Sequence, residues 1–352
     1  MTAQPGPRWN NGPRNNAKQR RQRRRQAEFC AALDLGTNNC RLLVARPAPD
    51  GFRIVDAFSR VVQLGAGVEE TGRLSEAAIR RAIDALKVCA GKIRKRDVRQ
   101  GRYVATAACR KAENCGTFLD QVKRETGLGI EIITAEEEAR LTLAGCGPLL
   151  DGDAPRALVF DIGGGSTEVL WLEINGSRPE LIDWISLPLG VVTLTERHGQ
   201  GPFIPEAYRS IVDAVLERLQ PFCEQHDIAR HVRISGVQML GSSGTVTTLA
   251  GLSQDLPRYD RSRVDGSFLD FETVHRLAGM LSAMGALDRA AHPCIGRDRA
   301  DMMAAGCAIL EAICQRWPVG RLRVADRGVR EGILVDLMGR NGDDAATGNG
   351  RG

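Results

Sequence analysis

The sequence lacks several features that define large classes of protein. Aromatic residues make up only 5% of its 352 residues, and it contains no run of 18 apolar residues. Because a transmembrane helix needs about 20 consecutive apolar residues, this excludes a membrane-spanning helix. The first residues are charged, but no apolar segment follows them, which excludes a secretory signal peptide. We therefore expect a cytoplasmic protein.

Sequence signatures of metal sites and disulfide frameworks are also missing. The ten cysteines are scattered without a Cys-x-x-Cys motif, and the five histidines do not cluster. This pattern argues against a zinc site of the usual spacing. Several cysteines lie in apolar periodic segments, so we interpret them as reduced and mostly buried thiols.

Acidic residues are absent from residues 1–26. This segment contains eight Lys and Arg residues, whereas the whole chain has a net charge of +5, so the rest carries a net charge of −3. The segment is rich in Pro, Gly, Asn, Gln and Arg and has too few apolar side chains to fold. We predict a disordered basic tail over residues 1–27 and a polar tail over residues 341–352. The overall basic charge therefore does not indicate a nucleic-acid-binding domain.

Glycine, by contrast, is abundant, with 39 residues, and the length suits two domains. One pattern occurs twice, about 127 residues apart: an apolar strand that ends in Asp-x-Gly, then a turn and a second apolar strand. The first copy is at Asp34-Leu35-Gly36 and the second at Asp161-Ile162-Gly163. This spacing is too long for a solenoid and indicates a duplicated α/β domain.

The two glycine-rich loops are the strongest functional signal. Such a turn exposes backbone N–H groups and lets the backbone approach a phosphate closely. The carboxylates of Asp34 and Asp161 offer the hard oxygen ligands that Mg²⁺ prefers. Two ordinary β-hairpins are the alternative, but matching positions in both halves favour a clamp around a chain of phosphates. The predicted phosphate-binding residues are Gly36, Thr37, Asn38 and Asn39 in the first loop and Gly163, Gly164, Gly165 and Ser166 in the second.

A third segment, residues 241–248, is rich in Gly, Ser and Thr and opens an apolar helical stretch. We predict a strand over residues 232–235 before it and helices from there to the C-terminus. A helix N-terminus favours anions, so Gly244 and Thr245 are further phosphate-binding candidates. A structural loop is an equally good interpretation of this segment alone.

An acidic cluster, Glu136-Glu137-Glu138, precedes Arg140 at the start of a predicted helix. Thr134 and Glu137 fit a capping box, and acidic residues suit the first turn of a helix. That explanation does not require Glu138. Clustered carboxylates opposite a phosphate clamp can raise one pKa and so create a general base.

Two further side chains have both a structural and a functional interpretation. Arg110 follows a predicted strand and is either a surface residue or a guanidinium that binds phosphate oxygens. Glu168 lies seven residues after Asp161, across the second loop. It is either an outward strand residue or a carboxylate that shares a metal ion with Asp161.

Taken together, these segments resemble the exopolyphosphatase/guanosine pentaphosphate phosphohydrolase family, within the acetate kinase–sugar kinase–Hsp70–actin superfamily. The string Asp161-Ile-Gly-Gly-Gly-Ser-Thr-Glu168, with Glu137-Glu-Ala-Arg140 upstream, is specific to this family. Further matching segments are residues 32–39, 105–110, 186–190, 244–250, 299–301 and 328–332.

The resemblance implies an α/β fold of two actin-like, ribonuclease H-like domains with a cleft between them. Domain I would span residues 28–136 and domain II residues 137–321. A C-terminal helix at about 322–340 would return to pack on domain I. Homodimer formation is compatible with the resemblance.

The resemblance also implies an Mg²⁺-dependent hydrolase that releases terminal phosphate from inorganic polyphosphate, guanosine pentaphosphate or both. Glu138 would be the general base. Asp161 and Glu168 would be catalytic acids that bind the metal together with Asp34, and Arg110 would contact phosphate.

Two alternatives follow from the same residues. A kinase-type relative would need an acidic residue in the first loop, and residues 37–41 contain none. A non-catalytic or weakly catalytic sensor of polyphosphate or of guanosine tetra- or pentaphosphate is less favoured, because Glu138, Asp161 and Glu168 are all present.

The sequence departs from the family pattern in two places. It has Ser243-Gly244-Thr245 where the family often has Gly-Gly-Thr, which weakens the expectation of a nucleotide contact there. Longer members carry an additional C-terminal helical domain related to His-Asp phosphohydrolases, with no counterpart in these 352 residues. We therefore expect short polyphosphate chains or the guanosine substrate to be favoured.

The basic tail generates one prediction. If residues 1–27 attract polyanions, deleting them will raise the apparent KM for long polyphosphate, and the effect will shrink as salt is added. Phosphate-release kinetics at low and high ionic strength measure this. An unchanged KM at low salt would show that the tail is only a solvated leader.

Overall fold

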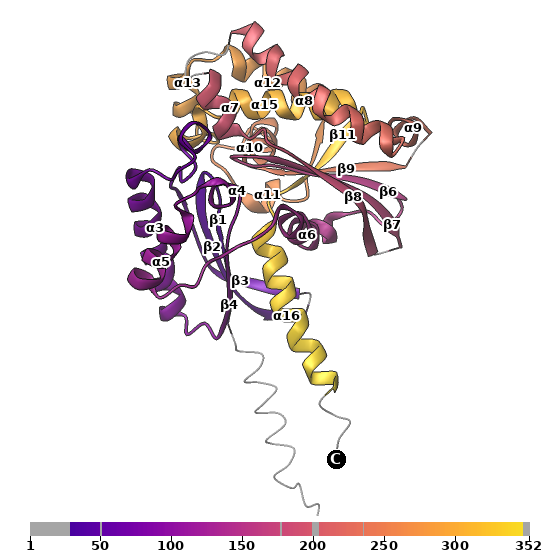
Figure 1. The fold of residues 1–352 in the computed structure, drawn as a ribbon. Coiled ribbons are helices and arrows are strands. Elements are labelled where there is room, and N and C mark those ends of the chain that lie inside the picture. The colour runs from indigo at the N-terminus through magenta and orange to yellow at the C-terminus, as the bar shows by residue number, and fades with distance from the viewer. Residues whose placement is uncertain (1–28, 50, 177, 199–203, 235, 348–352) are drawn as a thin grey trace, which may run out of the picture.

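The computed structural model describes residues 29–49, 51–176, 178–198, 204–234 and 236–347. The basic tail predicted for residues 1–27 lies outside this part of the chain. The described residues form two β-sheets, each with helices on both faces (Figure 1). Among them, no helix combines the length and apolarity that crossing a bilayer requires.

The sheet of domain I has the strand order β3-β2-β1-β4-β5. The first three strands form an antiparallel meander, and β4 and β5 continue the sheet parallel to β1. Helices α3 and α5 cover one face (Figure 1). The elements are β1 (Cys30–Leu35), β2 (Asn39–Ala48), β3 (Gly51–Val61), α2 (Val68–Thr71), α3 (Glu76–Lys95), β4 (Gln100–Ala105), α4 (Ala107–Lys111), α5 (Cys115–Thr126) and β5 (Glu131–Ile132).

The sheet of domain II repeats this plan with one added edge strand, in the order β10-β11-β9-β6-β7-β8. Strands β6 to β8 form the meander, and β9 and β11 continue it in parallel. The elements are η1 (Gly147–Leu149), β6 (Arg156–Ile162), β7 (Thr167–Asn175), β8 (Arg178–Leu187), α7 (Val191–His198), α8 (Pro205–Gln225), α9 (Ile228–Ile234), β9 (Val237–Ser243), α10 (Gly244–Ser253), α11 (Arg261–Val264), β10 (Phe268–Asp270), α12 (Phe271–Ala283), α13 (Ala286–Ala291), α14 (Arg297–Ala300), α15 (Met303–Arg316) and β11 (Arg321–Ala325).

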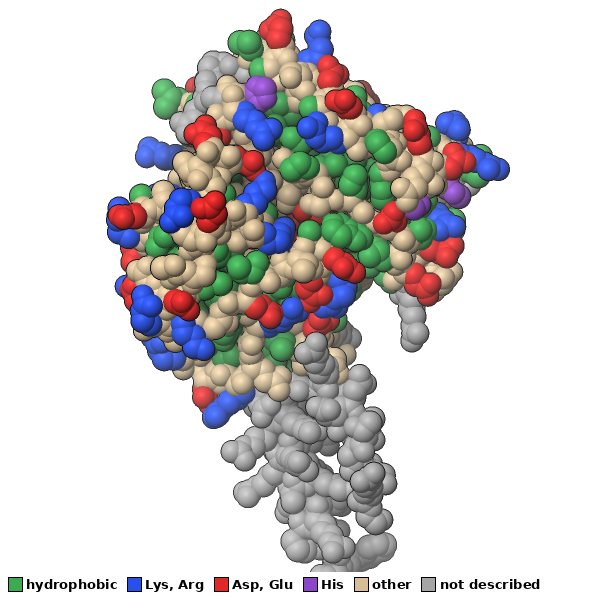
Figure 2. Space-filling view, in the orientation of Figure 1, with side chains coloured by type: hydrophobic (Ala, Val, Ile, Leu, Met, Phe, Trp, Pro, Cys, Tyr) green, Lys and Arg blue, Asp and Glu red, His purple; other side chains and the backbone are tan. Residues whose placement is uncertain are grey.

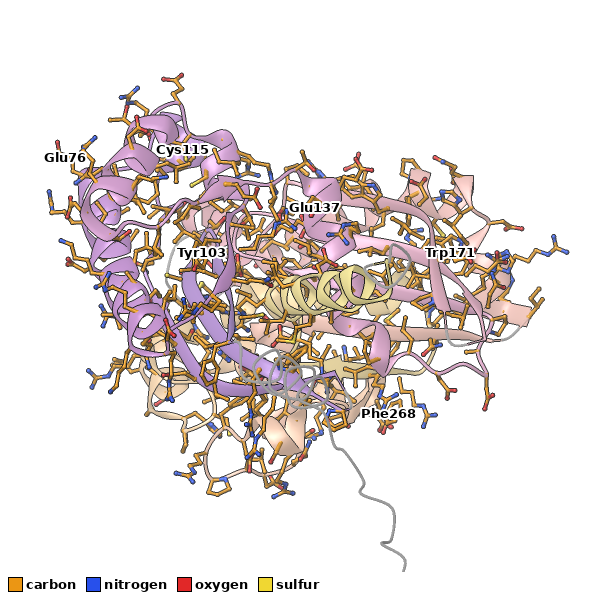
Figure 3. The ribbon with its side chains drawn as sticks, turned by 90° about the horizontal axis from the view of Figure 1, so that it is seen from below. Glu76, Tyr103, Cys115, Glu137, Trp171 and Phe268 are labelled. Carbon is orange, nitrogen blue, oxygen red and sulfur yellow. The ribbon has the colours of Figure 1, made fainter. Side chains whose placement is uncertain are left out.

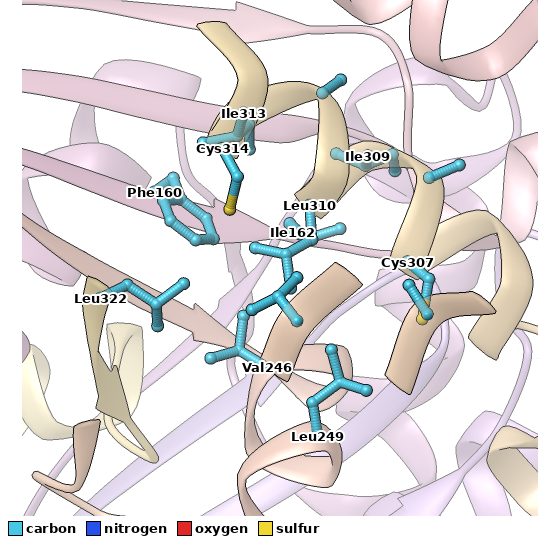
Figure 4. Close-up of a cluster of buried hydrophobic side chains, with 14 of the residues drawn as sticks. Phe160, Ile162, Val246, Leu249, Cys307, Ile309, Leu310, Ile313, Cys314 and Leu322 are labelled. Carbon is cyan, nitrogen blue, oxygen red and sulfur yellow. The ribbon is translucent and has the colours of Figure 1, made fainter. Parts of the chain in front are cut away.

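The two strand orders therefore confirm the predicted fold, a pair of duplicated actin-like domains. The central strands are apolar on both faces, as expected where helices cover a sheet on both sides. In β6, Phe160 and Ile162 join the core formed with α10 and α15, which Figure 4 shows. Ala157 and Val159 alternate with them and face the opposite core.

Two helices connect the domains. Each follows one domain in the chain and packs on the sheet of the other domain. Helix α6 (Ala135–Cys146) follows the last strand of domain I but places Ala139 and Cys146 against the sheet of domain II. Helix α16 (Val329–Thr347) follows the last strand of domain II but packs Ile333 and Leu334 on β1 and β2. The two helices thus exchange partners between the domains.

The backbones of α6 and α16 touch where the helices cross. A Cβ atom added to Gly332 would lie 2.0 Å from the carbonyl oxygen of Leu141, and one added to Gly145 would lie 2.2 Å from that of Gly328. Real Cβ atoms do not approach so closely, so both positions require glycine. The crossing of the two helices is therefore fixed by residues that have no side chain.

Three predicted segments differ from the structure. Residues 228–234 form α9, and the strand expected at 232–235 lies instead at 237–243, after Gly236 with φ of 83°. Residues 241–243, expected in a loop rich in glycine and serine, form the end of β9. Gly241 is needed there, because an added Cβ would lie 2.5 Å from the ring of Phe160. Strands β10 and β11 were expected to be helical.

The C-terminal helix also has different bounds. Residues 322–325 belong to β11, and α16 continues to Thr347, where we expected a tail from residue 341. Ala345 and Ala346 have high helix propensity, which favours the extension. Residues 348–352 lie outside the described part of the chain.

The helix crossing predicts that the same substitution, Gly→Ala, has opposite effects on stability at two positions of α16. Gly332→Ala should destabilise the protein by about 3 kcal/mol, because the methyl group would overlap the backbone of α6. Gly339→Ala is the matched control in the same helix: nothing lies within 4 Å of an added Cβ there, and the gain in helix propensity should raise stability by up to about 1 kcal/mol. Urea unfolding of both variants measures the difference. Equal stability would refute the tight crossing.

Candidate active site

A cavity of about 430 Å³ lies between the two domains. Its walls come from the loops that follow β1 and β6, the start of α10 and the turn between β11 and α16. We call residues 36–39 loop 1 and residues 163–166 loop 2. All eight predicted phosphate-binding residues of these loops line the cavity, as do Gly244 and Thr245.

Loops 1 and 2 have the same backbone geometry. In loop 1 the N–H of Gly36 donates to the carbonyl of Asn39 at 2.9 Å, and in loop 2 the N–H of Gly163 donates to that of Ser166 at 2.9 Å. The duplication detected in the sequence thus extends to the hydrogen bond that closes each turn.

The carbonyl groups of each loop are bound by a neighbouring segment of the same domain. In loop 1, the Asn38 carbonyl accepts from the N–H groups of Val62 at 2.8 Å and Gln63 at 2.9 Å. In loop 2, the Gly164 carbonyl accepts from the N–H of Val192 at 2.8 Å, in the first turn of α7. Each loop is therefore held in place through its carbonyl oxygens.

Four backbone N–H groups of the loops remain free. Within the described residues, the backbone N–H groups of Thr37, Asn38, Gly164 and Gly165 form no hydrogen bond. Unpaired N–H groups in a turn create a concave site for anions. Both loops line one cavity, so their free donors are available to the same ligand.

The two loops also touch each other across the domain boundary. A Cβ added to Gly165 would lie 2.8 Å from the hydroxyl oxygen of Thr37, and one added to Gly164 would lie 3.0 Å from the Cβ of Thr37. The glycines of loop 2 thus leave the space that Thr37 fills.

One end of the Asn38 side chain has no partner. Asn38 is 7% exposed, and its Oδ1 atom is buried without a hydrogen bond. A side-chain amide can present its oxygen or its nitrogen at that position, and leaving either unpaired costs free energy. This group therefore fits a ligand or a water molecule in the cavity.

Asp34 and Asp161 occupy equivalent positions at the ends of β1 and β6, and both line the cavity. Burial raises the pKa of each carboxyl group, to about 7 for Asp161, and the nearby Arg41 guanidinium opposes the rise in both. Glu138 adds to the rise at Asp161 because it carries a like charge.

Glu168 lies behind loop 2 and does not line the cavity. It is 3% exposed, and its Oε1 accepts hydrogen bonds from the hydroxyls of Ser166 at 2.7 Å and Ser186 at 2.9 Å. It is paired with Asp161 in the β6–β7 ladder. Burial raises the pKa of Glu168 to about 7. The structural interpretation of Glu168 as an outward strand residue is therefore wrong.

Glu138 lies in the first turn of α6 and faces the cavity. Its side chain is 13% exposed, and its Oε2 accepts a hydrogen bond of 2.7 Å from Nη1 of Arg110. Burial and the charge of Glu168 raise the pKa of Glu138 to about 8, against the opposing effect of Arg110. A carboxyl group with this pKa can act as a base near neutral pH.

Arg110 lies in α4 and makes its contacts below the cavity surface. Besides Glu138, its Nη1 donates to the carbonyl of Ile133 at 3.0 Å. The predicted contact of Arg110 with phosphate stays a prediction, because the contacts formed here go to protein groups. In this arrangement Arg110 orients Glu138.

Five arginines that we did not predict as site residues also line the cavity. Arg41 is paired with Asp34 in the β1–β2 ladder, as Glu168 is with Asp161 in β6–β7. The 127-residue repeat that relates the two aspartates therefore also points to Arg41. The others come from short helices, a turn and the first turn of α16, which carry no comparable signal. They are Arg261, Arg299, Arg327 and Arg330.

Three of these arginines have partners at the end of the cavity nearest β11. Arg261 bonds to Glu331 at 2.8 Å, and Arg327 bonds to Asp265 at 2.7 Å. Arg299 lies over the ring of Tyr259, 5.9 Å from its centroid. This end of the cavity is held together by paired charges.

The carboxylates of the cavity fit a hard divalent cation as a pair of oxygen ligands, not as a complete cage. Among the described residues, no three His, Cys, Asp or Glu side chains are close enough together to hold a metal ion by themselves. The predicted trio of Asp34, Asp161 and Glu168 is thus not a ready metal cage, since serine hydroxyls already bind Glu168. Mg²⁺ usually takes one or two carboxylates and completes its shell with water and phosphate oxygens. The buried carboxylates of Asp34 and Asp161 match that requirement.

Comparison with known proteins identifies the family to which this chain belongs. The sequence profile of the Ppx/GppA phosphatase family matches residues 43–341. The chain is similar to Exopolyphosphatase 2 of Mycobacterium tuberculosis, with 33% identity over 332 residues that cover 88% of this chain and 98% of the relative. It is also similar to the guanosine-5'-triphosphate,3'-diphosphate pyrophosphatase of Aeromonas salmonicida, with 31% identity over 314 residues. That match covers 89% of this chain but only 60% of the relative.

A solved structure of a Ppx/GppA family member from Aquifex aeolicus has the same fold. The TM-score is 0.73 at 30% sequence identity, covering 89% of this chain and 98% of the solved one. The family resemblance expected from the sequence is thereby confirmed. With its duplicated sheets, its paired glycine loops and this match over most of its length, the chain belongs to the Ppx/GppA phosphatase family.

Proposed function

We propose that this protein is an Mg²⁺-dependent hydrolase that releases the terminal phosphate of inorganic polyphosphate, of guanosine pentaphosphate, or of both. The observation that carries the proposal is the position of Glu138. Its buried carboxylate faces the cavity that the free N–H groups of loops 1 and 2 also line. A base and an anion clamp in one cavity are what attack by water on a phosphoanhydride needs.

In the proposed reaction, Glu138 accepts the proton of the attacking water. Its raised pKa suits this role, because the carboxylate keeps enough basicity near neutral pH to take the proton. Arg110 holds the carboxylate at a fixed orientation. Attack in line then displaces the rest of the phosphate chain.

The free N–H groups of Thr37, Asn38, Gly164 and Gly165 stabilise the negative charge on the transferred phosphoryl group. They need no reorganisation, because the loop carbonyls are already bound from the other side. Asp34 and Asp161 are the residues placed to hold Mg²⁺, which supplies charge neutralisation on the phosphate oxygens when bound.

A non-catalytic sensor of the same ligands is the second candidate. The free loop donors alone would support binding without turnover. The sensor leaves unexplained why a carboxyl group with a pKa raised to about 8 faces the cavity beside the free loop donors. The hydrolase is therefore the better interpretation.

Replacing the base tests the hydrolase directly. Glu138→Gln should lower kcat for phosphate release by about 10²- to 10⁴-fold, because the amide cannot accept the proton. The measurement is phosphate release with Mg²⁺ from long polyphosphate, short polyphosphate and guanosine pentaphosphate.

Glu136→Gln is the matched control, since Glu136 is an exposed residue two positions earlier in the same helix. It should keep the wild-type rate. Turnover by Glu138→Gln at the wild-type rate would remove Glu138 as the base. Binding without release by the wild type would favour the sensor.

The buried carboxylates also predict how stability depends on pH. Their pKa values, about 8 for Glu138 and about 7 for Asp161 and Glu168, lie above those of the unfolded chain. The folded state therefore holds protons that the unfolded state has lost, so the metal-free protein should lose several kcal/mol of stability between about pH 5 and pH 8.

Thermal unfolding at pH 6 and pH 8 measures this loss. Mg²⁺ should raise the Tm more at pH 8 than at pH 6, because the ionised carboxylates bind it. Glu138→Gln should reduce the pH dependence in the metal-free protein. A metal-free protein whose stability rises from pH 6 to pH 8 would contradict the assigned pKa shifts.

A further inference from the structure

A chain of ion pairs runs through Glu137, directly beside Glu138 in the first turn of α6. Arg102 in β4 donates from Nη1 to Oε1 of Glu137 at 2.7 Å. Arg140 donates to both carboxylate oxygens of Glu137, from Nε at 2.7 Å and from Nη2 at 2.9 Å. Figure 3 shows Glu137 between the side of the molecule labelled at Tyr103 and the side labelled at Trp171.

Both ends of this chain reach neighbouring elements. Arg102 also donates to Glu131 in β5 at 2.5 Å, and Arg140 donates to Asp336 in α16 at 2.6 Å. Figure 2 shows positive and negative side chains close together in the region of α6 and α16. Glu137 therefore connects the sheet of domain I, helix α6 and helix α16.

The capping box that we expected from the sequence forms only in part. The Thr134 hydroxyl accepts the N–H of Glu137 at 3.1 Å, as a capping residue does. The carboxylate of Glu137 does not return to the backbone of Thr134, because both of its oxygens bind arginines. The side chain of Glu137 thus needs an explanation other than helix capping.

Glu137 and Glu138 hold the same turn of α6 from two directions. Consecutive residues in a helix point about 100° apart. Glu138 is bound by Arg110 of α4, and Glu137 is bound by Arg102 of β4, so both anchors belong to domain I. Buried Ala139 and Leu141 hold the body of the helix, and the two anchors add restraint to the side chains of its first turn from two directions.

Stability alone explains these pairs poorly. The side chains of Arg102 and Glu137 are 23% and 26% exposed, and ion pairs so close to the surface contribute little free energy of folding. The two-pronged contact of Arg140 adds geometric specificity rather than much energy. The geometry of these pairs instead fixes the orientation of the first turn of α6.

We propose that Arg102 and Glu137 are positioning residues that act through Glu138: they fix the first turn of α6 to domain I and so hold the carboxylate of Glu138 against the phosphate loops. This inference rests on the proposed function, since it assigns a position to the proposed base. A substitution far from the reacting atoms lowers the rate by a large factor when it displaces a catalytic group even slightly.

The test compares three variants of the full chain in phosphate release with Mg²⁺. Arg102→Gln should lower kcat about tenfold with KM within about twofold of the wild type, because it displaces the base and leaves the phosphate loops intact. Arg102→Lys keeps the charge and should recover most of the rate. Glu137→Gln should match Arg102→Gln, which keeps the test decisive if one variant folds poorly.

Arg156→Gln is the matched control. Arg156 is also a partly exposed strand arginine, 26% exposed, and pairs with Glu173 at 2.9 Å at the opposite end of β6 from Asp161. It should keep the wild-type kcat. A wild-type kcat for Arg102→Gln, or an equal loss for Arg156→Gln, would overturn the proposal.

A double substitution tests whether the effect passes through Glu138. In the Glu138→Gln background, Arg102→Gln should not lower the residual rate further, since no base remains to be positioned. A further tenfold loss in that background would show that Arg102 acts by another route and would overturn the proposal.

Hydrogen exchange separates this proposal from the proposed function. Amides of residues 135–139 should exchange about tenfold faster in Arg102→Gln than in the wild type or in Arg156→Gln. If the wild type releases no phosphate from either substrate, the proposed function fails, and exchange alone decides. Unchanged exchange then overturns the anchoring of α6, and faster exchange supports it.

Discussion

The close approach of helices α6 and α16 is the constraint on which the rest of the structure depends. Their backbones meet at Gly145 and Gly332, where an added methyl group would overlap carbonyl oxygens. Because each helix follows one domain and packs on the other, this contact sets the relative placement of the two sheets. The cavity, the meeting of loops 1 and 2 and the position of Glu138 all follow from that placement. Interior packing of this kind has few alternative arrangements, so the site inherits its rigidity from the crossing.

Within that frame, the cavity concentrates groups that are costly to bury alone. Burial raises the pKa of Glu138, Asp161 and Glu168, their like charges add to the rise, and Arg41 and Arg110 partly offset it. Serine hydroxyls and guanidinium groups bind these carboxylates and so reduce the free energy that their burial costs. The loop carbonyls, which would repel an anion, are bound by neighbouring backbone N–H groups. The result is a cavity lined by free backbone N–H groups and by buried carboxyl groups.

Local sequence was enough to predict the two loops, the strands beside them and the start of α6, because an Asp-x-Gly turn and a capping Thr134 act within a few residues. It failed where a residue's environment is set from far away. Residues 241–243 were expected in a loop, yet they end a strand in which Gly241 is required by the ring of Phe160 in the neighbouring strand. Glu137 satisfied a capping pattern, but arginines 35 positions before it and three after it determine its contacts. The arginines of the cavity come from elements scattered between residues 41 and 330, which no spacing rule connects.

The two halves of the molecule share a backbone but differ in charge at one equivalent position. Arg41 faces Asp34 in the first hairpin, whereas Glu168 faces Asp161 in the second. A cavity with true two-fold symmetry would present the same groups from both domains. Here Arg41 lines the cavity from domain I, whereas its counterpart Glu168 is buried outside the cavity lining in domain II, so the two sides of the cavity differ in charge. A scaffold built by duplication thus acquires two unlike walls through one exchanged residue.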